Sequence, residues 1–265
     1  MIDWNPIAEK FREADAILIG ASNGLSITEG LHLFADNATF ERLFGDFKQK
    51  YGLHCILQGM MAGWPSEEEK WAFWARLIHR YCGQYQPTPV MNDLKAIVGE
   101  KDYFVVTSNG EGHFELCGFD PTKIYEIEGN WITMQCARPC HDTLYSSLEV
   151  AEKLSAAEQG GHVPTELVPR CPKCGGPMDI HMGAGQRMIR MPLPRHGSKT
   201  SENLPRKETG GSGAGHWLAQ SADQGPDDAP GGRRAKRHLC DHQSGGDLHC
   251  GQYQREVLRT GRAAG

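Results

Sequence analysis

The sequence predicts an α/β fold: a parallel sheet with a helical insert and a small cysteine-rich domain, followed by a disordered tail. Two short apolar runs, Ala16–Ile19 and Tyr103–Val106, each lead into a turn of small and polar residues, as strands of open α/β sheets do. Residues 37–99, which lie between the two runs, carry apolar side chains at helical spacing. Four cysteines in two close pairs follow the second run.

Composition divides the 265-residue chain into two unlike parts. Residues 186–265 hold roughly 10% Ile, Leu, Val and Phe, below the roughly 20% at which a segment no longer builds a core. This tail carries a net charge of +5, whereas residues 1–185 carry −10. An acidic body lacks the basic stripe that follows a phosphate backbone, so we expect no nucleic-acid partner. The basic run at 233–237 fits a solvated tail.

The expected cellular location depends on two sequence features that we do not find, a membrane span and a signal peptide. No apolar window approaches the roughly 18 residues of a membrane span, and the first residues have no signal-peptide pattern. Nine cysteines without a secretion signal argue against a disulfide framework. We expect a cytoplasmic protein with no membrane partner, in which Cys55, Cys82 and Cys117 are small core residues.

The first apolar run predicts a strand, a glycine turn and a helix in that order. A short amphipathic helix over residues 4–12 precedes a buried strand, Ala16–Ile19, which ends at Gly20. The turn Gly20–Ser26 follows, and Ile27–Leu31 can start the next helix. Such a turn lets a pyrophosphate approach backbone N–H groups, as in a Rossmann-like sheet. Glycine turns are also common without a ligand, and G-x-G-x-x-G is not matched.

The helical insert and the second strand continue the pattern. Ser66-x-x-Glu69 is a capping box, and the aromatic residues at 71–81 recur at the spacing of a core-facing helix. The strand Tyr103–Val106 runs into Thr107-Ser108-Asn109-Gly110-Glu111. Polar residues at the carboxyl end of a strand lie where open α/β sheets bind ligands.

The cysteine pairs predict a structural zinc site. Cys136-x-x-x-Cys140 and Cys171-x-x-Cys174 place four thiolates on two turns, which fills a tetrahedral zinc site and leaves no position for a catalytic water. His141 is a possible substitute ligand but is better explained as a neighbour. The alternative is a pair of turns that bind no metal.

In order and spacing, these motifs resemble the sirtuins over residues 14–183. Standard members read G-I-S-x-x-S-G, T-Q-N-I-D and E-L-H-G, followed by four cysteines. This chain has Gly24-Leu25-Ser26 with Gly30, then Thr107-Ser108-Asn109, then Glu126-Ile127-Glu128-Gly129. The insert with Trp71-Ala72-Phe73-Trp74, and Gly112-His113-Phe114, resemble most the class M branch, whose members often accompany a macrodomain protein and a lipoyl carrier.

Departures from the standard pattern bear on the reaction. Ser22 and Asn23 stand where standard members have Gly and Ala, no Asp-Phe-Arg follows Gly30, and Glu111 replaces an Asp. Glu128 replaces the His that acts as general base in deacetylating sirtuins. Class M members also lack that His and are associated with protein ADP-ribosylation. The resemblance therefore favours ADP-ribosyl transfer over deacylation, although Glu128 could equally be a solvated surface carboxylate.

The resemblance implies NAD and zinc as cofactors and a role for each matched residue. Asn109 would orient the ribose or a water, Glu111 would hold the carboxamide, and Glu128 would accept a ribose hydroxyl hydrogen bond. The residues expected to bind NAD are Ala21, Ser22, Gly24, Leu25, Ser26, Thr107, Ser108 and Asn109. Those expected to bind zinc are Cys136, Cys140, Cys171 and Cys174. Capping of the strand end is the alternative role for Asn109 and Glu111.

The tail suggests a shifted reading frame. A sirtuin needs more sheet after the second cysteine pair, yet residues 186–265 contain no strand-like run. Back-translation from Glu202 with freely chosen synonymous codons, read one base later, can give two apolar strands, LVVLELG and TYVTIN, with a glycine turn and an asparagine. Without such strands, we expect an unpaired apolar edge beside Val105.

Three functions remain open at this point. We expect an NAD-consuming protein ADP-ribosyltransferase, with a lysine deacylase or a non-catalytic nucleotide- and zinc-binding module as alternatives. The substrate is expected to be a protein, with a lipoyl carrier and a macrodomain protein as candidate partners. The domains expected are residues 1–183, with a zinc subdomain at about 132–183, and a low-complexity tail at 184–265.

Overall fold

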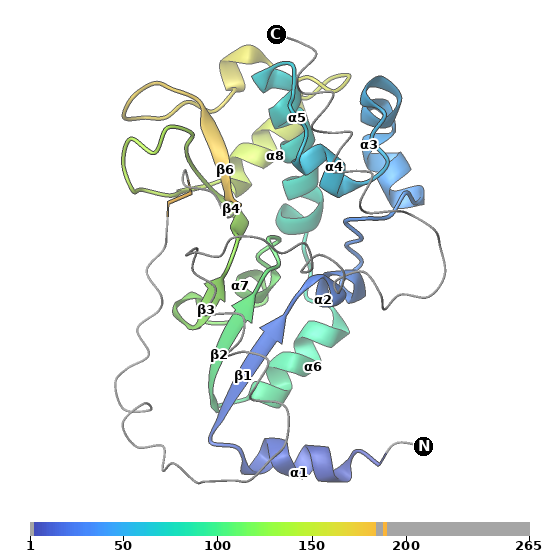
Figure 1. Cartoon of the computed structure of the whole chain (residues 1–265), viewed down its shortest axis with the longest axis vertical. Coiled ribbons are helices and arrows are strands. Elements are labelled where there is room, and N and C mark those ends of the chain that lie inside the picture. Colours follow the sequence, from blue (N-terminus) through green and yellow to red (C-terminus); the bar gives the residue numbers. More distant parts are fainter. Residues whose placement is uncertain (1–2, 184–187, 190–265) are drawn as a thin grey trace, which may run out of the picture. The chain divides into compact units, whose positions relative to one another are not determined.

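The computed structural model describes residues 3–183, 188 and 189, and these lie within one compact unit of the chain (Figure 1). The expectations for the tail at 184–265 therefore fall almost wholly outside the described residues. Two three-stranded sheets organise the described part. The first, sheet A, contains both strands predicted from apolar runs, and the second, sheet B, carries the cysteine turns.

Sheet A is entirely parallel, with strand order β1-β2-β3. It consists of β1 (Ala16–Ala21), β2 (Asp102–Thr107) and the short β3 (Ile124–Glu126). The register pairs Ala21 with Thr107 and Thr107 with Glu126, so all three strands end at one edge. The predicted α/β class and parallel sheet are confirmed. The expected free edge beside Val105 is wrong, because β2 is the central strand; among the described strands the edges are β1 and β3.

Strand β1 is buried on one face only, which corrects the expectation of a buried strand. Ile17 and Ile19 point into the core, whereas Leu18 between them is 58% exposed. Successive side chains of a strand point to opposite faces, and the described helices cover the face that carries Ile17 and Ile19. That core also contains Met91 and Val98 of α6 (Pro89–Val98).

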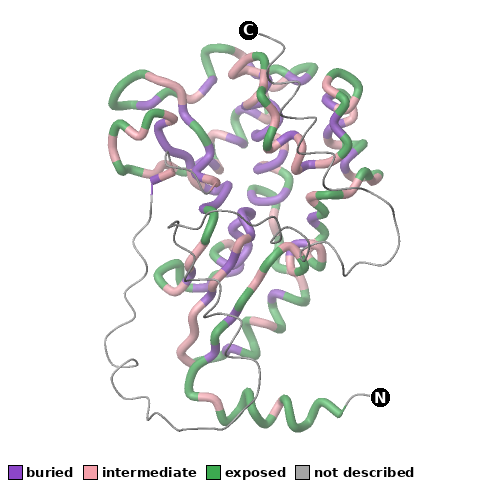
Figure 2. The backbone as a smooth tube through the Cα atoms, in the orientation of Figure 1, coloured by how far each residue is buried: buried purple, intermediate pink, exposed green. Residues whose placement is uncertain are grey.

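The helices around sheet A include one that begins earlier than predicted. Helix α1 (Asn5–Glu13) confirms the amphipathic helix and has no buried residue, as its colour in Figure 2 shows. Helix α2 (Asn23–Thr28) begins directly after Ser22, not at Ile27. The extended Ser22 caps it, because its carbonyl accepts a hydrogen bond from Leu25 N at 2.8 Å. The glycine turn is therefore shorter and the first polar residues are helical.

The helical insert contains α3 (Ala38–Tyr51), α4 (Ile56–Met60), α5 (Glu67–Ile78) and a π-helical turn, η1 (His79–Gly83). Ser66 Oγ accepts a hydrogen bond from Glu69 N at 3.2 Å, which confirms the helix start expected there. The aromatic stripe is core, since Trp71, Phe73 and Trp74 are buried. No helix in the described ranges is long and apolar enough to cross a membrane.

Sheet B is antiparallel, with strand order β5-β4-β6. Its strands are β4 (Gly129–Cys136), β5 (Tyr145–Ser146) and β6 (Met178–Met182), and α8 (Leu148–Ala157) packs against α5. Short 3-10 turns lie at Pro121–Lys123, η2, and Thr165–Leu167, η3; the four-residue α7 is His113–Leu116. The buried residues of sheet B and of the helical insert form one continuous core.

Candidate functional site

The carboxyl edge of sheet A brings the two predicted polar turns together. Ser108 N donates to the carbonyl of Ala21 at 3.2 Å, and Ser108 Oγ donates to Ser22 Oγ at 3.1 Å. The parallel pairing of β1 with β2 places both turns at the same edge. This edge is where open α/β sheets bind ligands. Ala21, Ser22, Thr107 and Ser108 therefore lie where the sequence predicted a nucleotide.

The turn into α2 leaves room for a ligand backbone. A Cβ atom added at Gly20 or Gly24 would meet no heavy atom within 4 Å. Gly24, Leu25 and Ser26 all lie at the start of α2, where Leu25 N already donates to the Ser22 carbonyl. The missing side chains thus leave open space beside the beginning of this helix.

Glu111 joins the two turns through a buried hydrogen bond. Ser26 Oγ donates to Glu111 Oε1 at 2.8 Å, and both residues are buried. Cys82 Sγ, on the π-helical turn, lies 3.3 Å from the carbonyl of Glu111 and fixes its backbone from the opposite side. Glu111 is therefore held in contact with α2 and with the π-helical turn.

Three buried polar atoms at this edge have no hydrogen-bond partner among the described residues. They are Asn109 Nδ2, Glu111 Oε2 and Asn23 Oδ1. Asn109 itself is held by its backbone, whose N–H donates to Thr107 Oγ1 at 3.0 Å. Buried polar atoms are nearly always paired in folded proteins, so unpaired ones need a reason. An amide donor and a carboxylate acceptor on the same loop are suited to a polar ligand.

The glutamate that ends β3 and the glutamate that follows it differ in their surroundings. Glu128, the predicted catalytic residue, is exposed, and its carbonyl accepts a hydrogen bond from Gly183 N at 2.8 Å. Glu126 is half-buried and accepts a hydrogen bond from Asn130 Nδ2. Burial and the carboxylates of Glu115 and Glu111 raise the pKa of Glu126 to about 7, against the opposite effect of Asn130.

A second buried polar cluster lies behind α2 and was not predicted. Glu29, whose side chain is fully buried, accepts hydrogen bonds from Tyr85 Oη at 2.7 Å and from Thr88 Oγ1. His113 stacks on Tyr85 at 3.9 Å between ring centroids, and its Nδ1 lies 3.7 Å from Glu29 Oε2. No local sequence pattern predicts this cluster, because Glu29, residues 85–88 and His113 are far apart in the sequence.

The four predicted cysteine ligands converge at the turns of sheet B. Their sulfur atoms all lie within 4.8 Å of one another. Cys136 Sγ is 3.7 Å from Cys174 Sγ, and Cys140 Sγ is 3.6 Å from Cys171 Sγ. Zinc–sulfur bonds of about 2.3 Å in a tetrahedron imply sulfur–sulfur distances of about 3.8 Å. The geometry fits zinc, and these residues could bind it.

Backbone donors favour the thiolate form of two of these cysteines. Hydrogen bonds from the backbone of Cys140 and Arg138 lower the pKa of Cys136 to about 6. The pKa of Cys171 is also lowered, because backbone N–H groups of Cys174 and Lys173 outweigh its burial. His141 Nδ1 lies 3.0 Å from Cys140 Sγ, and its Nε2 lies 2.8 Å from Tyr145 Oη. His141 is thus a neighbour of the sulfur cluster.

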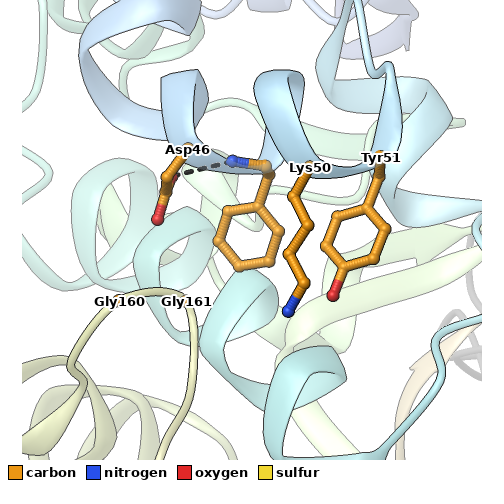
Figure 3. A pocket seen from close by; sticks show the side chains of 6 residues that line it. Asp46, Lys50, Tyr51, Gly160 and Gly161 are labelled. Carbon is orange, nitrogen blue, oxygen red and sulfur yellow. Dashed lines mark hydrogen bonds between the residues drawn. The ribbon is translucent and has the colours of Figure 1, made fainter.

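A small hollow elsewhere does not coincide with this site. Asp46, Lys50 and Tyr51 of α3 line it opposite Gly160 and Gly161, as Figure 3 shows. Its cavity volume is about 70 Å³, far below the roughly 300–1,000 Å³ of typical small-molecule sites. None of its lining residues belongs to the predicted site.

Sequence comparison finds two curated relatives. The chain is 34% identical over 172 residues to a protein ADP-ribosyltransferase of Staphylococcus aureus strain Mu50, which covers 64% of the chain and 53% of that protein. It is 28% identical over 184 residues to a probable bifunctional ADP-ribose hydrolase/ADP-ribosyltransferase of Fusarium oxysporum f. sp. cubense, which covers 67% of the chain and 30% of that protein. No protein-family model matches the chain.

Both relatives are named as ADP-ribosyltransferases, the second as a probable one. The chain spans about half the length of the first of these relatives and less than a third of the second. Solved structures found by comparison include a Sir2 homologue in complex with NAD, at 14% identity and a TM-score of 0.49, covering 72% of this chain and 64% of the other. A mutant Sir2 homologue in complex with ADP-ribose has 13% identity and a TM-score of 0.46, with coverage of 71% and 66%.

Proposed function

We propose that this sirtuin-type chain is an NAD-consuming protein ADP-ribosyltransferase. One observation carries the proposal: the loop that follows β2, at the carboxyl edge of a parallel sheet, carries two buried polar atoms without a partner, Asn109 Nδ2 and Glu111 Oε2. An amide donor beside a carboxylate acceptor suits the hydroxyl and carboxamide groups of a nicotinamide ribonucleoside. The activities named for the two curated relatives support the same reaction class.

The residues that would hold NAD follow from the same edge. Backbone N–H groups of the turn and of early α2, over residues 21–26, would bind the pyrophosphate, where open space lies beside Gly20 and Gly24. Thr107 and Ser108 would line the opposite side. When bound, NAD supplies an ADP-ribosyl group whose bond to nicotinamide can be broken.

The residues of this chain would act mainly by positioning and charge. Asn109, fixed by Thr107, would orient the ribose or the incoming group, and Glu111, fixed by Ser26, would hold the carboxamide. A group held in reacting geometry saves much of the entropy cost of the reaction. Glu128 is exposed and free to approach a ribose hydroxyl from solvent.

Zinc would be structural in this proposal. Four cysteine sulfurs complete a tetrahedral site, so no position remains for substrate. The metal would tie the turn that follows β4 to the turn that precedes β6, which supports sheet B. The seven described cysteines form no disulfide, which fits a reducing compartment such as the cytoplasm.

The proposal also includes the acceptor of the ADP-ribosyl group and the partner proteins. We propose a protein acceptor, with a lipoyl carrier protein as the first candidate and a macrodomain protein as the accompanying partner, as in class M sirtuins. The name of the Fusarium relative, which joins an ADP-ribose hydrolase to a transferase, supports such an association. We further propose the sirtuin-type domain at 1–183, its zinc subdomain at about 132–183, and a frameshifted remnant at 184–265.

Product analysis tests the reaction class. The chain is incubated with NAD and, in separate reactions, a lipoyl carrier protein, an acetylated peptide, or neither. A transferase releases nicotinamide and adds one ADP-ribosyl group to the protein, which intact-protein mass spectrometry detects. Acyl-ADP-ribose would instead identify a lysine deacylase, and NAD binding without nicotinamide release would identify a non-catalytic module.

A further inference from the structure

Glu126 lies at the same sheet edge as the proposed NAD site, although no motif singled it out for catalysis. It is the last residue of β3 and pairs with Thr107, two residues before Asn109. Ile127 N donates to the carbonyl of Thr107 at 2.9 Å, which fixes the end of β3 against β2. The parallel register therefore places Glu126 beside the loop that carries Asn109 and Glu111.

One oxygen of Glu126 is held by an oriented amide. Asn130 Nδ2 donates to Glu126 Oε2, while Asn130 Oδ1 accepts from Thr133 Oγ1 at 2.8 Å. The Thr133 hydroxyl thereby fixes which end of the amide faces the carboxylate. Glu126 Oε1 makes no hydrogen bond to any residue in the described ranges. One oxygen is thus anchored and the other is available to accept a proton.

The charges around Glu126 are all of its own sign. Glu111 acts on it from the loop after β2 and Glu115 from α7, whereas Asn130 of β4 is neutral. Burial and these two carboxylates hold the pKa of Glu126 at about 7. A general base works best when its pKa lies near the operating pH, and this arrangement is typical of a catalytic carboxylate.

We propose that Glu126 is the general base of the ADP-ribosyl transfer, a proposal that rests on the proposed function. The glycosidic bond from the ribose C1′ to nicotinamide breaks, and its electron pair leaves with nicotinamide, which becomes neutral. The protic nucleophile of the acceptor bonds to C1′, and its proton moves to Glu126 Oε1. The carboxylic acid so formed returns this proton to solvent after the product leaves.

The first measurement is the pH profile of single-turnover nicotinamide release, made on the chain as it stands and on E126Q. General-base catalysis contributes roughly 10²- to 10⁴-fold, so E126Q is expected to lose at least about 100-fold at pH 8. The wild-type rate falls below a midpoint near pH 7, and E126Q lacks that fall. NAD affinity, measured by calorimetry at pH 8, stays within a few-fold, because the amide oxygen introduced by E126Q still accepts the Asn130 hydrogen bond.

A second variant separates a base from a merely structural carboxylate. Glu115 is exposed and raises the pKa of Glu126, so E115Q is expected to move the midpoint to lower pH while leaving the plateau rate unchanged. E149Q removes an equally exposed charge from α8 and serves as the matched control, with no shift expected. Direct titration of the glutamate carboxyl carbons by NMR is expected to show one signal that titrates near pH 7 and is absent in E126Q.

The outcomes distinguish failure of this inference from failure of the proposed function. If the rate of nicotinamide release by E126Q falls at low pH as it does in wild type, the role of Glu126 is overturned but the proposed transferase reaction is not. The role of Glu126 is also overturned if E115Q does not shift the midpoint of the pH profile, or if no glutamate NMR signal titrates near pH 7. A wild-type chain that binds NAD but releases no nicotinamide overturns the proposed reaction, and the role of Glu126 with it.

Discussion

At the scale of single residues, the site depends on side chains that use only part of their hydrogen-bonding capacity. Glu111 accepts from Ser26 through Oε1 and leaves Oε2 buried and unpaired. Asn109 anchors its backbone to Thr107 and leaves its amide nitrogen unpaired. A buried polar atom without a partner costs about 1–3 kcal/mol. The fold therefore tolerates a loss of stability at this edge that a polar ligand would recover.

Replacement of Asn109 tests its positioning role. We expect Asn109→Ala to reduce nicotinamide release by about 100-fold or more, because misplacement of reacting groups costs rates of this order. Zinc content is expected to stay unchanged, because Asn109 does not contact the cysteine cluster. Asn92→Ala, an exposed change on α6, is the control. Unaltered turnover in Asn109→Ala would remove the residue from the site.

Replacement of Glu126 also has a predicted effect on stability. The pKa of Glu126 rises from an ordinary 4.5 to about 7 on folding, so the folded state holds the proton more tightly. The free energy of unfolding therefore decreases as pH rises from 4.5 to 7, because the folded state must release this proton. The decrease is on the order of 3 kcal/mol.

Thermal unfolding at two pH values checks this sign. Because the amide introduced by E126Q cannot ionise, we expect this variant to melt at a higher temperature than wild type at pH 8 and at a similar temperature at pH 5. E149Q again provides the control. Equal melting temperatures of E126Q and wild type at pH 8 would show that the carboxyl ionises without penalty.

At the scale of elements, the cysteine turns connect strands that are distant in the sequence. Cys136 ends β4, and Cys171 and Cys174 precede β6, which pairs with β4. Thiolate ligation couples metal binding to folding. A bound metal would therefore stabilise sheet B, whereas without it the four sulfur atoms face one another with no counter-charge.

Zinc analysis of Cys171→Ser tests this coupling. We expect the variant to lose the roughly one equivalent of zinc bound by wild type and to melt at a lower temperature. Cys55→Ser, which changes a half-buried cysteine outside the cluster, is expected to keep its zinc. Treatment of wild type with a strong chelator should reproduce the lower melting temperature. Full zinc retention in Cys171→Ser would contradict the assigned ligand set.

The local sequence pattern predicted helices and strands better than it predicted which elements pack against them. Ala16–Ile19 and Tyr103–Val106 were recognisable as strands because they are short apolar runs before polar turns, and Ser66 was recognisable as a helix cap. The start of α2 was missed because capping by the extended Ser22 carries no strong signal. The burial of Leu18 was overestimated because an apolar run does not reveal whether one face or both are covered.

The other features of the site depend on contacts between residues that are distant in the sequence, which local patterns do not predict. The Glu29 cluster needs residues from three separate segments of the chain, and the raised pKa of Glu126 depends on where Glu111 and Glu115 come to lie. The cysteine site was predictable despite its span, because two cysteine pairs at this spacing in a chain without a secretion signal strongly favour metal ligation.

At the scale of the whole molecule, sheet A has an open side in the described part. Strand β1 pairs only with β2 there, and Leu18, on the sheet face opposite Ile17 and Ile19, is 58% exposed. An unpaired apolar edge favours aggregation. We propose that the two apolar strands of the shifted frame would cover it.

Restoring the frame is expected to change both stability and binding. We expect the chain as written to be cut readily by protease within 186–265 and to show no slowly exchanging amides there. The frame-restored chain should have a protected C-terminal half, a cooperative melt and tighter NAD binding. Sequencing the gene around codons 184–202 provides an independent check. A tail that resists protease in the written chain would refute the frameshift.

Trp131 gives the molecule a built-in optical reporter. Its backbone N–H donates to the Gly110 carbonyl at 2.6 Å, and its indole Nε1 lies 2.8 Å from Met182 Sδ. A Cβ atom on Gly110 would lie 2.6 Å from that same nitrogen. The indole is thus wedged between the loop of Asn109 and Glu111 and the end of β6. Occupation of the site should alter tryptophan emission, and Trp131→Phe should abolish that change, so ligand binding can be followed by fluorescence without any attached dye.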